Sequence, residues 1–129
     1  MFHLNHIHLR SPDPHKSAQW YVEHLGAKII SEGKGLGNSI AIRMDLGGAT
    51  INVSGSPTGA SLPEGSSEYH WGLEHFGLDT NDITAAVDQL SSNGVEVLLP
   101  ITEMPTGGTL IAYVKGPDEV MIELVQRKS

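Results

Sequence analysis

Hydrophobic and polar residues alternate near the start of the chain. In the segment HLNHIHLRS, Ile7 and Leu9 alternate with His6, His8 and Arg10. A period of two predicts a β-strand with one apolar face and one polar face. Because side chains alternate across a strand, we expect the two histidines to point away from whatever covers Ile7 and Leu9.

An amphipathic helix is predicted directly after this strand. Asp13 is a suitable N-cap, Pro14 suits the first helical position, and Gly26 suits the end of the helix. The apolar stripe at helical spacing consists of Ala18, Tyr21, Val22 and Leu25. The stripe must be buried, so the helix is expected to cover the Ile7 and Leu9 face of the sheet.

The rest of the chain reads as further strands, and the second half repeats the order of the first. Strands are predicted over 27–31, 39–45 and 49–55, with the Gly-rich residues 32–38 as a turn. In the second half we expect a strand over 73–80, a helix capped by Thr80 or Asn81, and strands over 95–100, 109–115 and 119–126. Residues 55–70 are rich in Gly, Ser and Pro and are predicted to be a linker.

Equivalent landmarks recur at a nearly constant spacing. His6 and His75 lie 69 positions apart, Tyr21 and Leu90 are also 69 apart, and Asn52 and Glu123 are 71 apart. We therefore predict a duplicated βαβββ module within a single α+β domain over 1–129, with module 1 at about 1–54 and module 2 at about 71–127. A module of this size buries little surface alone, so the modules are expected to pair within one chain or between two.

Composition narrows the class of function. The formal charge is −7, which disfavours nucleic acid as a partner. No apolar run is long enough to span a membrane, and the first residues lack a secretory signal, so we expect a cytoplasmic protein. The absence of cysteine excludes disulfides and thiolate metal sites.

Four polar positions are expected on the sheet face that no helix covers: His6, Asn52, His75 and Glu123. Two imidazoles and one carboxylate form a ligand set for a divalent metal with open coordination positions. His8 is predicted to be a cleft residue that contacts substrate or water, although a His-x-His chelate is the alternative. A cupin-like barrel is disfavoured because the nearby glutamate of that motif is missing and two helices are indicated.

The sequence resembles the vicinal oxygen chelate superfamily, which includes glyoxalase I, methylmalonyl-CoA epimerase, extradiol dioxygenases and fosfomycin-resistance thiol transferases. The resemblance is carried by NHIHLRSPDPHKSAQWYVEHLGAKI, by GLEHFGLDTNDITAAVDQLSSNGVEV, and most specifically by GPDEVMIELVQ. It implies a curved, mostly antiparallel sheet around a metal cleft, with the helices on the outer face.

The resemblance also implies a function. His6, His75 and Glu123 would hold one divalent ion (Fe²⁺, Mn²⁺, Zn²⁺ or Ni²⁺), which chelates two oxygens of a small substrate; Glu123 and His8 would be catalytic. Asn52 stands where glyoxalase I carries Glu or Gln, so it is a fourth ligand or an orienting group and cannot act as a base. Isomerase or lyase, ring-cleaving dioxygenase and thiol transferase activities remain open.

Four further residues are predicted to contact substrate, and a metal-free binding protein is the alternative to an enzyme. Arg10, Arg43, Asp79 and Tyr113 are candidate substrate contacts. A metal-free, drug-sequestering protein of the bleomycin-resistance type is the alternative to an enzyme. Exposed sheet edges favour a homodimer under either interpretation.

Overall fold

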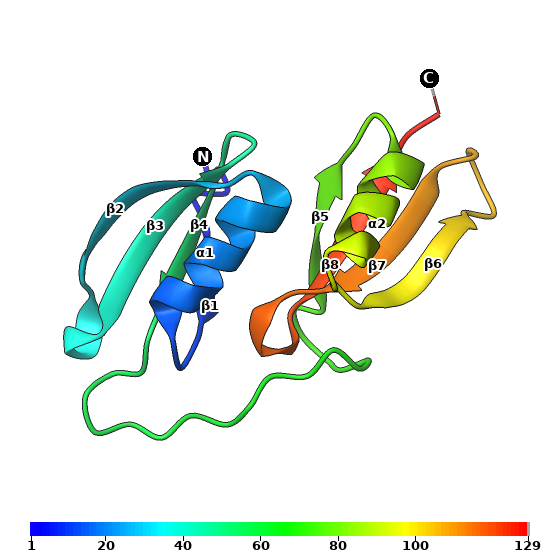
Figure 1. Cartoon of the computed structure of the whole chain (residues 1–129). Helices are drawn as coiled ribbons and strands as arrows, with labels where there is room; N and C mark the ends of the chain where they lie inside the picture. The colour runs from blue at the N-terminus through cyan, green and yellow to red at the C-terminus, as the bar shows by residue number, and fades with distance from the viewer. Residues whose placement is uncertain (129) are drawn as a thin grey trace. The chain divides into compact units, whose positions relative to one another are not determined.

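The computed structural model describes residues 1–128, which form two compact units, one over Met1–Glu64 and a second that begins at Gly65. Each unit contains one α-helix that packs on one face of its own curved four-stranded sheet (Figure 1). The division falls inside the Gly-, Ser- and Pro-rich segment of the sequence. No helix within residues 1–128 has both the length and the hydropathy needed to cross a bilayer.

Unit 1 contains the strands β1 (Ile7–Arg10), β2 (Lys28–Lys34), β3 (Ile40–Leu46) and β4 (Ala49–Ser54), the helix α1 (Pro14–Leu25) and the 3₁₀ turn η1 (Leu36–Asn38). The strand order is β1-β4-β3-β2, with β1 and β4 parallel and the other pairs antiparallel. The predicted helix signals are confirmed: the Asp13 side chain accepts a hydrogen bond from Lys16 N at 3.1 Å, and Gly26 has φ +74°.

Unit 2 repeats this arrangement with β5 (His75–Asp79), α2 (Ile83–Ser92), β6 (Val97–Glu103), β7 (Leu110–Lys115), η2 (Pro117–Glu119) and β8 (Met121–Gln126). Its strand order is β5-β8-β7-β6, with β5 and β8 parallel and the other pairs antiparallel. The predicted α+β class with two βαβββ modules is confirmed.

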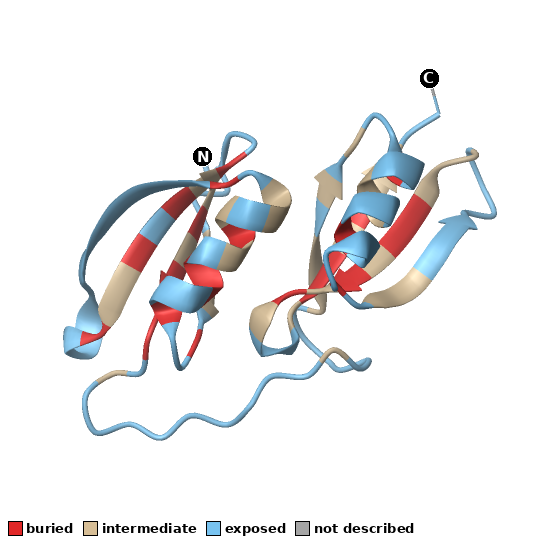
Figure 2. Cartoon of the chain, viewed as in Figure 1, coloured by how far each residue is buried: buried red, intermediate tan, exposed pale blue. Residues whose placement is uncertain are grey.

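The apolar core of each unit lies between its helix and its sheet, as the buried stripes in Figure 2 show. In unit 1, α1 buries Ala18 and Tyr21 against β3 and β4. In unit 2, α2 buries Ile83 and Leu90. The sheet residues of the two cores are Ile42, Met44, Leu46, Ile51 and Val53 in unit 1 and Ala112, Val114, Ile122 and Leu124 in unit 2. The residues between them along each strand therefore belong to the opposite face, which no helix of the same unit covers.

Two local predictions were wrong. The N-cap of α2 is Asp82, not Thr80 or Asn81: Asp82 Oδ1 accepts from Ala85 N at 3.0 Å, while Thr80 Oγ1 accepts from Asp82 N. The Gly-rich segment is not all turn, because β2 pairs with β3 as far as Lys34 and only η1 reverses the chain.

Candidate functional site

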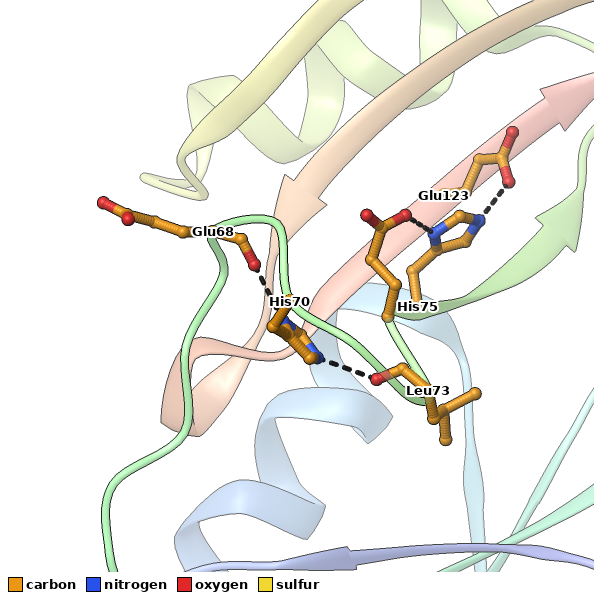
Figure 3. A network of polar contacts seen from close by, with 6 residues as sticks. Glu68, His70, Leu73, His75 and Glu123 are labelled. Atoms are coloured by element: carbon orange, nitrogen blue, oxygen red, sulfur yellow. Dashed lines mark hydrogen bonds and ion pairs between the residues drawn. The ribbon is translucent and has the colours of Figure 1, made fainter.

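In unit 2, two predicted metal ligands meet on neighbouring parallel strands. His75 begins β5 and Glu123 lies in β8, where it is in register with Gly77. Nε2 of His75 lies 2.8 Å from Oε2 of Glu123 (Figure 3). A Cβ added at Gly77 would lie at an ordinary van der Waals distance, 3.6 Å, from the same oxygen, so the contact passes directly beside the glycine.

Glu74 fixes the orientation of the His75 ring. Its Oε2 accepts from Nδ1 of His75 at 2.8 Å, and this contact directs Nε2 at Glu123. The sequence reasoning missed Glu74 because the predicted strand over 73–80 places Glu74, by alternation, on the face opposite His75, whereas the observed strand begins only at His75. Its position directly before a predicted ligand histidine was the available signal.

Tyr113 lies beside this pair. It is in register with Glu123 on β7, and its ring centroid is 5.2 Å from that of His75. Burial raises the pKa of Tyr113, and the carboxylates of Glu123 and Glu74 raise it further. The phenol is therefore protonated at neutral pH and can donate a hydrogen bond. Tyr113 also lines a pocket of about 460 Å³ whose other walls include Leu98 and Leu99.

The donor set of unit 2 fits one half of a metal site. Imidazole nitrogen and carboxylate oxygen bind Zn²⁺ and similar ions at ~2.0–2.2 Å, which places two adjacent ligands of a tetrahedral site ~3.3–3.6 Å apart. Nε2 of His75 and Oε2 of Glu123 lie 2.8 Å apart, a hydrogen-bond distance, so a small separation of the two side chains would let both bind one ion. Within residues 1–128, no group of three or more His, Asp or Glu side chains is arranged to hold a metal ion.

In unit 1, the predicted ligand His6 is exposed and lies directly before β1. Its Nδ1 donates to Asn5 Oδ1 at 2.7 Å, which leaves Nε2 as the acceptor nitrogen. Asn5 precedes His6 as Glu74 precedes His75, so the two repeat-equivalent histidines are held in the same way, through Nδ1, by the preceding side chain.

His8 and Asn52 face each other across the parallel pair β1 and β4. Asn52 Oδ1 is buried without a hydrogen-bond partner among the described residues, which costs ~1–3 kcal/mol unless a ligand supplies a donor or a cation. Burial lowers the pKa of His8, and the charges of Arg10 and His6 lower it further. The His8 imidazole is therefore neutral at neutral pH and can accept a proton.

The sheet face of unit 1 that α1 does not cover forms a pocket of about 400 Å³. One row of cross-strand neighbours runs through it: His8, Asn52, Arg43 and Ser31. Arg10 also lines the pocket, where its Nη1 donates to Gly55 O at 2.7 Å.

Asp79 does not join the His75 cluster. It ends β5, four residues from His75, and its Oδ1 lies 3.6 Å from Nε of Arg127. Both side chains are more than 70% exposed, and such surface pairs contribute little to stability. Asp79 is therefore the predicted contact residue with the least structural support.

His70 organises the segment that leads into β5. Its two ring nitrogens lie 2.8 Å from the backbone oxygens of Glu68 and Leu73 (Figure 3). The contact with the backbone oxygen of Glu68 raises the pKa of His70 most, the contact with Leu73 raises it further, and the Glu74 carboxylate adds to the effect. With two acceptors facing its ring, His70 satisfies both contacts when both nitrogens carry a proton.

Curated relatives share the full length of the chain. A probable lactoylglutathione lyase from Vibrio parahaemolyticus is 31% identical over 127 residues, which cover 95% of this chain and 89% of the relative. The lactoylglutathione lyase of Salmonella typhimurium is 29% identical and covers 97% and 93%.

Solved structures and a family model agree on the fold. A glyoxylase/bleomycin resistance protein/dioxygenase domain from Frankia sp. superposes with a TM-score of 0.80 at 21% identity, over 100% of this chain and 94% of that chain. The fosfomycin resistance protein FosX from Listeria monocytogenes gives 0.77 at 17% identity, over 99% and 95%. A model of one family matches residues 3–124. The chain belongs to that family, the Glyoxalase/Bleomycin resistance protein/Dioxygenase superfamily.

Proposed function

We propose that the chain is a divalent-metal-dependent lyase or isomerase of this superfamily, with His6, His75 and Glu123 as the metal ligands. The observation that supports it best is the shared orientation of the two histidines. Each presents Nε2 because the preceding side chain holds Nδ1, and Nε2 of His75 already lies 2.8 Å from a carboxylate. Oxygen acceptors on the second ring nitrogen are a regular feature of metal-binding histidines.

The side chains around these ligands suggest their roles. A bound divalent ion would supply Lewis-acid stabilisation of negative charge on two substrate oxygens. Glu123 would bind the ion and lie beside the reacting centre, while Tyr113 would donate a hydrogen bond to substrate. Because Asn52 is a neutral amide, His8, directly opposite it, is the group we assign to accept a proton in unit 1.

The relatives support the reaction class that we propose. Lactoylglutathione lyases at 25–31% identity span this chain, so a lyase acting on a small oxygenated substrate is the activity we propose first. Neutral Asn52 distinguishes this chain from the pattern expected of glyoxalase I, and the lyase assay should therefore use lactoylglutathione alongside other small hydroxylated thioesters and acids.

Metal content of the purified full chain tests the ligand set. We expect about one divalent ion per chain in the wild type, and its loss in His6→Ala, His75→Ala and Glu123→Ala. His15→Ala is the matched control, since His15 is an exposed imidazole on α1 whose contact is a 3.6 Å ion pair with Glu32. Unchanged metal stoichiometry in all three ligand variants would refute the proposal.

We also propose that the chain forms a homodimer. Every residue of the edge strand β2 is exposed, including Ile29 and Ile30 at 41% and 57%. Exposed apolar edge strands pair readily with a second chain. Sedimentation equilibrium should give twice the mass of the chain, and a monomer at micromolar concentration would contradict this assignment.

Metal-free binding of a small molecule is the second candidate function, and one observation favours it. The pocket of unit 2 is lined by Leu98, Leu99 and Met121 together with Tyr69 and Tyr113, a lining that suits an apolar or aromatic ligand. A ligand bound in this way should retain its affinity in excess EDTA, whereas the metalloenzyme should lose substrate affinity.

A further inference from the structure

We propose that the pocket of unit 1 binds an oxyanion group of the substrate, a carboxylate or a phosphonate that carries a neighbouring hydroxyl, through the guanidinium of Arg43. The inference extends the proposed function, because it names the chemical class of the substrate for that site. It concerns residues of unit 1 alone.

Arg43 is a cation without a partner. Among residues 1–128 it makes no ion pair or side-chain hydrogen bond, whereas Lys115 and Arg127 are paired with carboxylates and Arg10 is bound to Gly55 O. In a chain of net charge −7, acidic side chains outnumber basic ones almost two to one. A guanidinium left unpaired in a pocket of such a protein is available to bind an external anion.

The neighbours of Arg43 leave its charge intact. Asn52 is its partner in register on β4, and Ser31 is its partner on β2, so both flanking positions are neutral. A carboxylate at position 52 would lie directly across the ladder from Arg43 and would pair with it. The amide at this position therefore keeps Arg43 free for an anionic ligand.

Asn52 also defines what lies next to the anion. Its Oδ1 is buried and accepts no hydrogen bond in the described structure. An acceptor beside an unpaired guanidinium suits a ligand that presents a hydroxyl next to its oxyanion, because the hydroxyl donates to Oδ1 while the anion binds Arg43. Arg10 and Lys34 add two further positive charges to the lining of the same pocket, against the single carboxylate of Glu32.

Amide NMR of the full chain in excess EDTA tests this site without any contribution from a metal. Lactate and hydroxymethylphosphonate are titrated separately, with sodium chloride at equal ionic strength as the reference. We expect saturable shifts of the Arg43 and Asn52 amides with at least one probe, and the probe that saturates identifies the carboxylate or the phosphonate as the source.

Three variants make the test specific to the proposed residues. Arg43→Met keeps the aliphatic stem and should weaken binding by about 10-fold or more, because the charge-assisted hydrogen bonds to the anion are lost. Asn52→Asp should weaken it similarly through charge repulsion and pairing with Arg43. Arg127→Met, which removes an exposed cation in unit 2, should bind as the wild type does.

Two results would overturn the inference: no saturation with either probe in the wild type, or equal affinity in Arg43→Met and the wild type in proteins whose spectra show an intact fold. Both are independent of metal binding. A chain that binds the probes through Arg43 but contains no metal would refute the proposed function alone. A chain that binds metal through the proposed ligands but does not bind the probes would refute this inference alone.

Discussion

Substitution of Glu74 should weaken metal binding although Glu74 is not itself a proposed ligand. Its carboxylate lies 2.8 Å from Nδ1 of His75, and the two side chains are 29% and 26% exposed. This contact keeps the ring in the orientation that directs Nε2 at Glu123. Side chains that orient a metal-binding histidine typically contribute ~10- to 100-fold to affinity.

The two substitutions at this position separate orientation from charge. Glu74→Gln retains an acceptor oxygen and loses the charge, so we expect a loss of about 10-fold, or ~1.4 kcal/mol. Glu74→Ala also removes the acceptor, and we expect a loss of up to about 100-fold, or ~2.7 kcal/mol. Because the Glu74 and His75 side chains are partly exposed, solvent screens the charge of Glu74, and loss of this charge alone should reduce metal affinity by the lower value of that ~10- to 100-fold range.

Competition against a chromogenic chelator, with Zn²⁺ or Ni²⁺ and the full chain, measures these affinities directly. Glu96→Gln is the control, since Glu96 is a 62% exposed carboxylate of the same unit that pairs with Lys115 at 3.6 Å, and it should bind metal as the wild type does. Wild-type affinity in Glu74→Ala, together with loss of the ion in His75→Ala, would refute the orienting role.

Three further predictions concern stability, each measured by urea unfolding of the full chain. Ile122→Ala should lower the free energy of unfolding by ~2–5 kcal/mol, because Ile122 is fully buried, whereas Leu4→Ala, at 87% exposure, should change it by less than ~0.5 kcal/mol. Asp82→Ala should cost ~1 kcal/mol through loss of the α2 cap, and Asn81→Ala should cost less than half of that. The pKa of His70 is raised above 6.5 by the backbone oxygens of Glu68 and Leu73, so its stabilising contribution is complete below about pH 6.5 and is lost as the pH rises through the raised pKa. The difference in unfolding free energy between the wild type and His70→Gln should therefore shrink as the pH is raised from below 6.5.

The elements were predictable from the sequence where the signal is local. Asp13 and Gly26 act within one turn of α1, and strand alternation placed Ile122 and Leu124 under a helix and Glu123 on the other face. The cap of α2 was not predictable, because Thr80, Asn81 and Asp82 are three suitable caps in a row. Only the backbone geometry determines that Asp82 Oδ1 reaches Ala85 N.

The candidate site was predictable to the extent that its residues lie within strands. Alternation put His75 and Glu123 on one face, but their contact also depends on β5 being the parallel neighbour of β8, which periodicity does not reveal. Glu74 precedes its strand, and the unpaired state of Arg43 depends on which residues face it from two other strands. The contact of Glu74 depends on where β5 begins, and the unpaired state of Arg43 depends on which strands flank β3. Periodicity within one segment gives neither.

The two sheets have the same strand order and register, but the side chains at equivalent positions of their open faces differ in chemistry. Along the same cross-strand row, the side chains of unit 1 and their counterparts in unit 2 are His8 and Gly77, Asn52 and Glu123, Arg43 and Tyr113, and Ser31 and Leu99. In unit 2, His75 contacts the carboxylate of Glu123 beside Gly77. In unit 1, the imidazole of His8 occupies the position equivalent to Gly77, His6 contacts Asn5, and Asn52 Oδ1 has no hydrogen-bond partner among the described residues. Unit 2 therefore carries a His–Glu pair on its open sheet face, and unit 1 carries a polar pocket with an unpartnered amide oxygen. The duplicated fold repeats the backbone positions, and the different residues at those positions give each unit its own chemistry.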